Sequence, residues 1–267
     1  MDLGVRGRLY IVVGGSRGMG FEAARVLAAD GARLALIGRS AKAVEAAAAA
    51  ISREFGVATT AHAADAAAEN GAIETMIADI VLAHGEPRGL LVTSGLTDHN
   101  GALNEMTDAD WEANFQDVLM GHVRAVRAAV PAMIAAGGGQ IVTTAAYSVR
   151  AAKSFLFGYA AMKAAIVNFT KNLAKAYGGQ GVRANCVCPG AFETERVIQS
   201  LEAVMAEQGL SREAAARHLV SDVWKMPVAM RRPGLAREAG ELMAFLLSER
   251  AGYLNGAIIN IDGGTDF

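Results

Sequence analysis

The sequence predicts an α/β protein: a doubly wound parallel sheet of about seven strands with helices on both faces. Along the 267 residues, short β-rich apolar runs alternate with longer alanine-rich stretches that have helical spacing. Strands that alternate with helices in this way pair in parallel and are covered on both sides. No linker or internal repeat interrupts the pattern, so residues 1–267 are expected to form a single domain.

The expected elements follow the chain in order. The first helix begins at a glycine-rich turn directly after the first strand, and Ser40 is placed to cap the second helix. Thr107 and Asp110 form a capping box just before the amphipathic run that starts at Trp111. The expected strands are Leu9–Val13, Arg33–Ile37, Ala58–Ala61, Gly89–Thr93, Gln140–Thr144, Val182–Val187 and Ala257–Ile261.

Composition and charge exclude several function classes. Hydrophobic residues make up 52% of the chain and charged residues 19%, which is too apolar for intrinsic disorder. The net charge of -2 arises without a long run of one sign, so no nucleic-acid partner is expected. No apolar stretch approaches the roughly 20 residues of a membrane span, and we expect a cytoplasmic protein without membrane contact. Cys186 and Cys188 are expected to be buried free thiols, so no metal site is predicted.

The glycine-rich turn after the first strand is a candidate phosphate-binding loop. Its glycines are spaced G-x-x-x-G-x-G and let the backbone turn sharply and approach a pyrophosphate. Unpaired amides at the start of the following helix would stabilise the negative charge. A tight turn without a ligand is the alternative. The expected cofactor contacts in this loop are Gly14, Ser16, Arg17, Gly18, Met19 and Gly20.

Further residues give this loop a context. Tyr159 and Lys163 form a Y-x-x-x-K pair at the start of the helix that follows the fifth strand, and Pro189 and Gly190 follow the sixth strand. In this order, these motifs resemble the short-chain dehydrogenase/reductase family along nearly the whole chain, with 3-oxoacyl reductases among the similar members. The resemblance implies a Rossmann fold and a nicotinamide cofactor. The remaining matches are Asp65, Thr194 and Asp262-Gly263-Gly264.

Tyr159 and Lys163 are the expected proton-transfer pair. Four residues apart on a helix, they project from one face. A neighbouring ammonium favours the phenolate, so Lys163 is expected to lower the pKa of Tyr159 from its usual ~10. By the resemblance, Tyr159 exchanges a proton with the substrate oxygen, and Lys163 also holds the nicotinamide ribose. The alternative is a packed tyrosine beside a solvated lysine.

The end of the second strand indicates which nicotinamide cofactor is bound. Gly38 occupies the position where an NAD-dependent relative carries a carboxylate against the ribose 2′-hydroxyl. Arg39 follows it, and Arg17 lies in the glycine loop, so two guanidinium groups can flank a 2′-phosphate. We therefore expect NADP(H) to be favoured over NAD(H), with a solvated strand-end Arg39 as the alternative.

The resemblance implies further contacts with the cofactor. Asp65 is expected at the adenine, although an aspartate at a strand end can instead cap a turn. The other positions that the resemblance places beside the cofactor are Gly95, Tyr159, Lys163, Pro189, Gly190, Phe192 and Thr194.

Two catalytic positions of the family are changed in this chain. The asparagine that completes the family's proton relay aligns with Val118, which cannot relay protons. Asn114 lies one turn earlier and can replace it, although a polar residue in an exposed first turn is the commoner case. The family's catalytic serine aligns with Ala146, which lacks a hydroxyl. Ser148 is expected to serve as the third catalytic residue, with a loop cap as its alternative.

These changes leave a second class of function open. Thr144 and Tyr147 are further hydroxyls near the position of the missing serine. Because the loss of a donor to the reacting oxygen costs on the order of 10²–10³ in rate in unrelated hydrolases, turnover is expected to be reduced. An NADP(H)-binding protein with attenuated or no turnover, acting as a binding or regulatory module, is therefore the alternative to an enzyme.

Residues 191–235 depart from the regular alternation and are expected to form a substrate-covering insertion. Residues 195–209 and 211–220 are predicted to be two short helices within it. In the resembling family this insertion covers the substrate, and an apolar underside suits an acyl chain or a ring. Ordinary core or a subunit contact is the alternative. The apolar side chains concerned are Val197, Leu201, Val204, Met205, Trp224, Met226 and Met230.

The sequence thus predicts an NADP(H)-dependent oxidoreductase that interconverts a carbonyl and a secondary alcohol on an apolar small-molecule substrate. His99 and Asn100, after the fourth strand, are expected as polar contacts on the opposite wall. Similar proteins form tetramers by pairing long helices, and the small side chains of the helix from Ala160 to Ala165 would allow such close approach. A homotetramer or homodimer is therefore expected.

Overall fold

The computed structural model describes residues 2–224, 226 and 228–265. Seven parallel strands form one sheet in the order β3-β2-β1-β4-β5-β6-β7. The predicted doubly wound sheet and all seven expected strands are confirmed, with boundaries shifted by at most a few residues. The strands are β1 (Leu9–Val13), β2 (Arg33–Gly38), β3 (Thr59–Ala63), β4 (Pro87–Val92), β5 (Gly139–Thr144), β6 (Val182–Pro189) and β7 (Ile258–Ile261).

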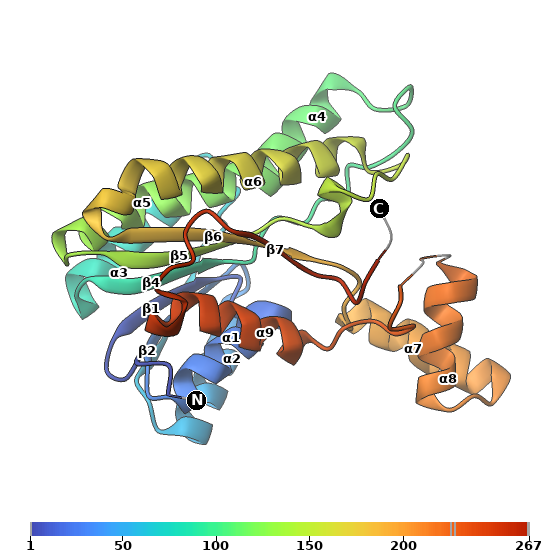
Figure 1. Cartoon of the computed structure of the whole chain (residues 1–267), viewed down its shortest axis with the longest axis horizontal. Helices are drawn as coiled ribbons and strands as arrows, with labels where there is room; N and C mark the ends of the chain where they lie inside the picture. Colours follow the sequence, from blue (N-terminus) through green and yellow to red (C-terminus); the bar gives the residue numbers. More distant parts are fainter. Residues whose placement is uncertain (1, 225, 227, 266–267) are drawn as a thin grey trace.

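Helices cover both faces of the sheet (Figure 1). One layer consists of α1 (Gly18–Ala29), α2 (Ala41–Phe55) and α9 (Ala236–Leu247). The other layer consists of α3 (Ala72–His84), α5 (Gly121–Ala135) and α6 (Phe157–Tyr177), and α4 (Asp108–Asn114) leads into α5. Short helical turns are η1 (Phe115–Met120), η2 (Tyr147–Val149), η3 (Gly178–Gln180), η4 (Leu219–Val223) and η5 (Glu249–Ala251).

Two hydrophobic cores lie on the two sides of the sheet. Alternate residues of each central strand point to opposite faces, so Val12 packs toward α1 and α9 while Ile11 packs toward α3 and α5. Every residue of β1 is buried, which explains why the sequence shows a continuous apolar run there. Burial on both faces therefore explains why the sequence predicts these strand positions.

The strand order reverses direction between β1 and β4. The chain winds outward from β1 through β2 to β3, then returns to place β4 on the other side of β1. Loops that follow the carboxyl ends of β1 and β4 therefore diverge at this point, where open α/β sheets bind ligands. The fold thus places the glycine loop at the expected binding edge.

The predicted helix caps are confirmed. The Ser40 hydroxyl accepts a hydrogen bond of 3.3 Å from the amide of Ala43 at the start of α2. Thr107 and Asp110 form a reciprocal capping box at the start of α4. The continuous helical segment Asp108–Ala135 is long and apolar enough to cross a membrane by composition alone, but half of its most apolar window is buried within the fold. It packs against the sheet as a core helix does.

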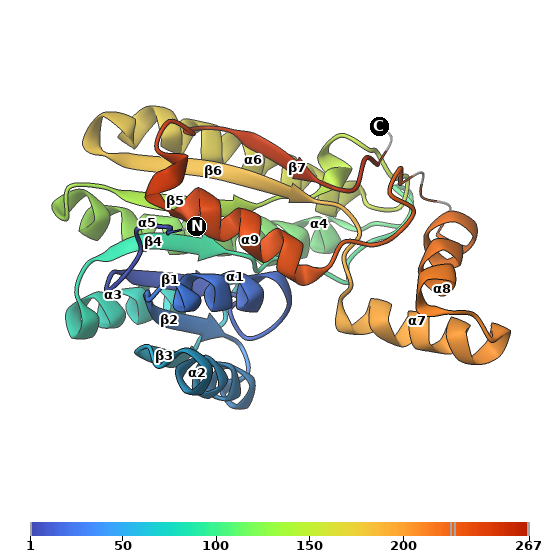
Figure 2. The same ribbon diagram turned by 60° about the horizontal axis from the view of Figure 1, so that its bottom comes forward.

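The insertion contains the two predicted helices, α7 (Glu195–Gln208) and α8 (Arg212–His218), which project from the carboxyl edge of the sheet (Figure 2). Leu201 of α7 is fully buried against Ala215 and Leu219, and the other apolar residues of the α7 stripe, Val197, Val204 and Met205, pack beside them. The stripe therefore forms a small core within the insertion, the alternative to a substrate-covering surface. The insertion returns to the sheet edge where Gly234 pairs with Phe192.

Candidate active site

The glycine loop is shaped by close contacts that leave no room for a side chain at Gly14 or Gly20. A Cβ atom at Gly14, where φ is +85°, would lie 2.5 Å from the Thr93 hydroxyl oxygen. A Cβ atom at Gly20 would lie 2.4 Å from the carbonyl oxygen of Gly14. The Thr93 hydroxyl itself donates to the carbonyls of Val13 and Gly14 at 3.1 and 3.2 Å. The loop backbone is thus held directly against the end of β4.

The start of α1 is suited to an anion. Gly18 has a φ of +59° and open space where a side chain would be, and no side chain of the described residues caps the first amides of the helix. Unpaired amides at a helix N-terminus attract phosphate groups. Ser94, on the adjacent loop, has a buried hydroxyl with no partner among the described residues. The cradle and the unpaired polar groups therefore fit the pyrophosphate of a dinucleotide.

The end of β2 lies beside the glycine loop. A Cβ atom at Gly38 would lie 3.2 Å from the Ser16 hydroxyl oxygen, so the two segments are in contact. Arg39 and Arg17 are both exposed at this edge. No side chain in the described part of the protein pairs with the Arg39 guanidinium. A cationic group is therefore available where the 2′-phosphate of NADP(H) is expected.

Other expected cofactor positions lie along the same carboxyl edge. Asp65 accepts a hydrogen bond of 3.0 Å from the amide of Ala67, so it does cap a turn, and its expected adenine contact stays a prediction. Gly95 has a φ of +110° and approaches the carbonyl oxygen of Val118 so closely that a Cβ would lie 3.0 Å away. Gly190 similarly lies against Asp262, where a Cβ would be 2.7 Å from Cα.

The segment after β6 completes this edge. Pro189 is the last residue of β6, and Phe192 is buried with its ring against Gly234. The Thr194 side chain accepts a hydrogen bond from the amide of Val197 and so caps α7. The structure brings these residues to the same end of the sheet as the glycine loop, and their contacts with a cofactor stay predictions.

Tyr159 and Lys163 lie together near the N-terminus of α6. The Lys163 ammonium donates a hydrogen bond of 3.1 Å to the carbonyl of Thr144 and lies 5.4 Å from the centroid of the Tyr159 ring. Burial lowers the pKa of Lys163 to about 8. Burial and the nearby Tyr147 raise the pKa of Tyr159 to about 12. The expected lowering of the Tyr159 pKa is therefore wrong, because desolvation of the phenolate dominates.

Ala146 and three hydroxyl-bearing residues lie at and just after the end of β5. Ala146 is buried, and the Ser148 hydroxyl is buried without a partner among the described residues. The Thr144 hydroxyl donates to the carbonyl of Val92 at 3.0 Å and is already used. Tyr147 is close enough to Tyr159 to raise its pKa. Ser148 and Tyr147 are therefore the two candidate donors to a substrate oxygen.

The position where the resemblance places a relay asparagine is packed with apolar side chains. Val118 is fully buried in a cluster with Ala145 and Ile166. Asn114 is also fully buried, and the interpretation of it as an exposed first-turn residue is wrong. Its amide donates to the carbonyls of His99 and Asp110 at 2.7 and 2.8 Å, which ties the loop after β4 to α4. Its carbonyl oxygen has no partner within the described chain.

Two histidines make contacts that the sequence did not predict. His122 is fully buried, with Nδ1 3.2 Å from the carbonyl oxygen of Val118. Burial, together with the charge of Lys163, lowers the pKa of His122 to about 3, so the ring is neutral. His99 has Nδ1 3.1 Å from Asp110, whose pKa falls to about 2 because Thr107 and His99 hydrogen-bond it. The only sequence signal for His122 was a polar residue within an apolar helix.

Cys186 and Cys188 are buried free thiols, as predicted. Both lie on β6 beneath α6, in the cluster that contains Val118 and packs against Tyr159. They contribute to the floor below the Tyr-Lys pair.

Together, the glycine loop at the switch point of a parallel sheet and the buried Tyr-Lys pair define a dehydrogenase or reductase built on a Rossmann fold. The chain belongs to the short-chain dehydrogenase/reductase family, since the family model described as Enoyl-(Acyl carrier protein) reductase matches residues 13–266. It is an oxidoreductase that acts on a carbonyl or alcohol group of a small-molecule substrate.

Named relatives match almost the whole chain. Levodione reductase of Leifsonia aquatica is 29% identical over 257 residues, which cover 96% of this chain and 93% of that protein. Galactitol 2-dehydrogenase (L-tagatose-forming) of Cereibacter sphaeroides is 33% identical over 262 residues, covering 97% and 94%. The crystal structure of L-sorbose reductase from Gluconobacter frateurii, complexed with NADPH and L-sorbose, has a TM-score of 0.89 and 27% identity, covering 99% and 98%.

Proposed function

We propose that the protein is an NADP(H)-dependent reductase or dehydrogenase that interconverts a carbonyl and a secondary alcohol on an apolar acyl or cyclic substrate. The observation that carries the cofactor preference is the end of β2, where Gly38 contacts Ser16 and Arg39 is exposed without a partner in the described structure. A carboxylate at this position would repel the 2′-phosphate, whereas a guanidinium pairs with it. The NADPH complex of the similar L-sorbose reductase supports this proposal.

In this proposal, residues already described hold the cofactor. The loop from Gly14 to Gly20 would cradle the pyrophosphate, Arg39 and Arg17 would flank the 2′-phosphate, and Lys163 would hold the nicotinamide ribose. When bound, the nicotinamide supplies or accepts the hydride. The protein's own task is then to position the substrate and to move one proton.

Tyr159 moves that proton. With a pKa of about 12 it is protonated at neutral pH, so it can donate to the oxygen of a carbonyl during reduction. Oxidation requires the phenolate, which becomes more abundant as the pH rises toward that value. We therefore expect oxidation to accelerate with pH. Loss of the Lys163 charge above its pKa of about 8 would remove a stabilising cation from beside the phenolate.

Ser148 is the proposed donor to the substrate oxygen. Its hydroxyl is buried and has no partner among the described residues, and a buried hydroxyl without a partner is costly unless a ligand supplies one. Tyr147 is the second candidate, since it already lies beside Tyr159. Either hydroxyl would polarise the carbonyl in place of the serine hydroxyl that is absent at Ala146.

Exposed apolar side chains on connections at the carboxyl edge of the sheet support the substrate class. Leu96 is 78% exposed, Phe155 is 57% exposed and Met230 is 59% exposed. They lie on the loops that follow β4, β5 and β6, so all three belong to the carboxyl edge of the sheet. Exposed large apolar residues that gather on one edge are typical of a ligand-binding surface. The α7 stripe gives no such support, because it packs against α8.

An activity screen tests this proposal. Cyclic ketones, diketones and short 3-oxoacyl thioesters should be reduced with NADPH faster than ketoses, and faster than with NADH. A clear preference for ketoses would contradict the apolar substrate, and a preference for NADH would contradict the cofactor assignment.

A cofactor-binding module without turnover is the second candidate, and the changes at Ala146 and Val118 favour it. It predicts that the protein shifts NADPH fluorescence on binding but consumes no NADPH with any carbonyl compound in the screen. Turnover that Tyr159→Phe abolishes would exclude this candidate.

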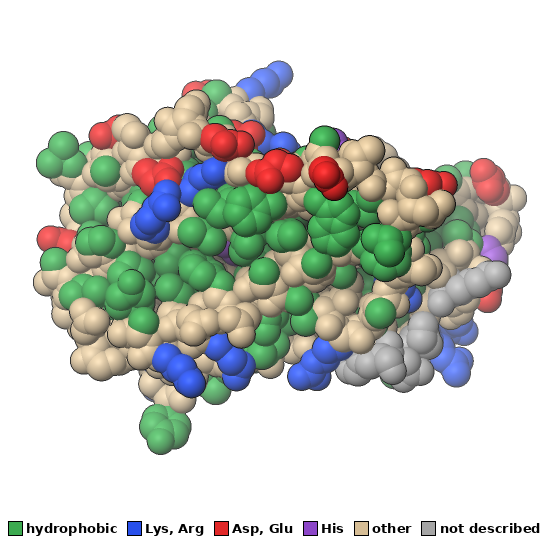
Figure 3. Space-filling view, turned by 90° about the horizontal axis from the view of Figure 1, so that it is seen from above, with side chains coloured by type: hydrophobic (Ala, Val, Ile, Leu, Met, Phe, Trp, Pro, Cys, Tyr) green, Lys and Arg blue, Asp and Glu red, His purple; other side chains and the backbone are tan. Residues whose placement is uncertain are grey.

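We also propose a cytoplasmic homotetramer or homodimer. Figure 3 shows hydrophobic side chains gathered over the face formed by α5 and α6. On α6, Ala161 and Ala164 are exposed and Met162 and Phe169 are only half-buried, which would allow a second helix pair to pack closely. The strand β7 also has an open edge. Sedimentation that shows only monomer would contradict this proposal.

A further inference from the structure

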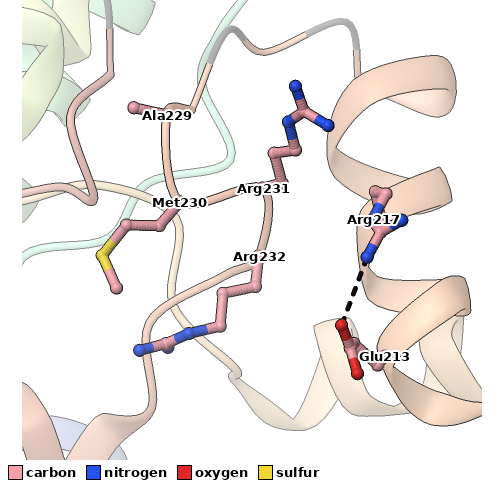
Figure 4. A pocket seen from close by; sticks show the side chains of 6 residues that line it. All are labelled: Glu213, Arg217, Ala229, Met230, Arg231 and Arg232. Atoms are coloured by element: carbon pink, nitrogen blue, oxygen red, sulfur yellow. Dashed lines mark hydrogen bonds and ion pairs between the residues drawn. The ribbon is translucent and has the colours of Figure 1, made fainter.

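A cavity of about 400 Å³ lies between α8 and the segment that follows η4 (Figure 4). It is separate from the glycine loop and has no role in the proton transfer described above. Three of its six lining side chains are arginines. The lining residues are Glu213, Arg217, Ala229, Met230, Arg231 and Arg232.

The charges around this cavity do not balance. Arg217 pairs with Glu213 at 3.2 Å, and both side chains of this pair are more than half exposed. Arg232 turns away to α9 and makes two hydrogen bonds with Glu238, at 2.9 and 2.7 Å. Arg231 has no partner among the residues that the structure describes. These three arginines and two glutamates therefore leave one positive charge, and it belongs to Arg231.

The backbone holds Arg231 in an unusual conformation. Its φ is +52°, and it is the one non-glycine residue with positive φ in the described part of the chain. Residues with a Cβ rarely adopt this region, and such outliers are often found at functional sites. Hydrogen bonds from the amides of Ala229 and Met230 to Gly264 and Gly263 fix the turn. As a result, the Arg231 side chain extends toward α8 (Figure 4).

The cavity lies close to the carboxyl edge of the sheet. Met230 belongs to its lining and also packs beside Gly263, just after β7. Gly234, a few residues further on, pairs with Phe192 next to the expected cofactor contacts. An ion pair between Arg212 and Glu193 at 2.5 Å joins α8 to the same segment. A molecule bound at this edge that passes across the exposed Met230 side chain would therefore lead toward Arg231.

We propose that this cavity binds an anionic group, such as a carboxylate, at the far end of the substrate, with Arg231 as its main partner and Arg217 as its second. The inference rests on the proposed function and narrows its substrate class to apolar carbonyl compounds with a terminal negative charge. A guanidinium is well suited to the task because it binds a carboxylate through two parallel hydrogen bonds. The Met230 side chain would contact the apolar part of the molecule.

Binding of hexanoate and of hexanamide to the full chain tests the proposal without requiring turnover. These two probes share an apolar chain and differ in charge at one end. Isothermal titration in the presence of saturating NADP⁺, which occupies Arg39 and Arg17 under the proposed function, should show at least fivefold tighter binding of hexanoate. Arg231→Gln should remove that difference, whereas Arg231→Lys, which keeps the charge, should retain part of it.

Arg237→Gln is the matched control. Arg237 is an exposed arginine of α9 that pairs with Glu241 at 2.7 Å, outside the cavity. This variant should bind both probes as the wild type does. Equal affinity of the wild type for the two probes, or an equal loss in Arg231→Gln and Arg237→Gln, would overturn the proposal.

The proposed anion site and the proposed enzymatic function can be tested independently. If neutral ketones are reduced but hexanoate affinity does not depend on Arg231, the anion site is wrong and the proposed function stands. If hexanoate binding depends on Arg231 but no carbonyl compound is turned over, the anion site stands and the enzymatic function fails. Raising the ionic strength should weaken hexanoate binding and leave hexanamide binding unchanged.

Discussion

The two halves of the active site, one beside β1 and β2 and the other beside β5, are built in different ways. In the first half, backbone atoms of Gly14 and Gly20 lie so close to Thr93 and to each other that a single added Cβ would clash. In the second half, Ser148 and Asn114 have buried polar atoms without partners within the described structure, and Ala146 and Val118 stand where the resemblance places a serine and an asparagine. Backbone contacts therefore shape the glycine loop, whereas the region around Tyr159 is shaped by side chains that neighbouring positions can supply.

This difference explains where the chain keeps the family pattern and where it departs from it. A pyrophosphate is the same for every substrate, and it is recognised by backbone amides that only a glycine turn can present. The reacting oxygen is recognised by side-chain hydroxyls, which neighbouring positions can supply without a change of backbone. We therefore expect substitutions in the first half to affect cofactor binding and stability, and substitutions in the second half to affect turnover.

The largest effect is expected for Tyr159→Phe in the second half. This substitution keeps the ring and removes only the hydroxyl, so turnover should fall by about 10²–10⁴ while NADPH affinity is retained. Initial rates and NADPH fluorescence titration would measure the two quantities. Retained turnover would mean that another group transfers the proton.

In the first half, Arg39→Ala should weaken NADP(H) binding by about 1.5–3 kcal/mol, the scale of a hydrogen bond between charged groups. Binding of NAD(H) should hardly change, since it lacks the 2′-phosphate. Titration of the wild type and of the variant with both cofactors measures how much each affinity changes. Equal losses for the two would contradict the assignment of Arg39 to the phosphate.

Gly20→Ala tests whether backbone contact governs the first half. The new methyl group would meet the Gly14 carbonyl oxygen at 2.4 Å, so we expect unfolding free energy to fall by about 1–3 kcal/mol. Gly179→Ala is the control, because no atom lies within 4 Å of the added methyl group. Chemical denaturation measures the unfolding free energy of both variants. If the two variants are equally stable, backbone crowding does not govern the first half of the site.

Ser148→Ala should lower turnover about tenfold if the Ser148 hydroxyl has replaced the missing serine. Ala146→Ser should then change little. The reverse result, with a silent Ser148→Ala and a gain in Ala146→Ser, would show that the donor was lost and not moved. If neither substitution alters the rate, Tyr147→Phe tests whether Tyr147 donates to the substrate oxygen instead.

The most gradual effect, spread over about two pH units, concerns stability at alkaline pH. Burial lowers the pKa of Lys163 from 10.5 to about 8, so between these values the unfolded chain binds more protons than the folded one. Unfolding free energy should therefore rise with pH over this window, by at most about 1.4 kcal/mol per pH unit for one proton. Lys163→Met should lack this contribution. Denaturation of the wild type and of Lys163→Met from pH 8 to 10 isolates this contribution as the difference in their unfolding free energies.

Much of the fold was predictable because its signals are local. The strands β1 and β4 are buried on both faces and therefore appear as continuous apolar runs in the sequence. The caps at Ser40 and Thr107 were visible for the same reason, since a cap and its partner lie within three residues of each other. The glycine loop could be located because its sharp turn and close contacts favour glycine at fixed spacings.

Contacts between distant segments decided what the sequence left open. The apolar stripe of α7 has the correct period for a buried face, but only the packed structure shows that α8 covers it. Asn114 lies in a polar helical turn, yet the loop that contains His99 buries it completely.

By itself, the sequence determined the sheet, the glycine loop and the pairing of Tyr159 with Lys163, because periodicity, backbone freedom and helical spacing act over a few residues. Tertiary structure alone decided the charge states of this pair, since desolvation sums over every segment packed around a group. It also decided which of the three arginines that line the cavity beside α8 lacks a partner among the described residues, because that depends on the positions of Glu213 and Glu238 in space.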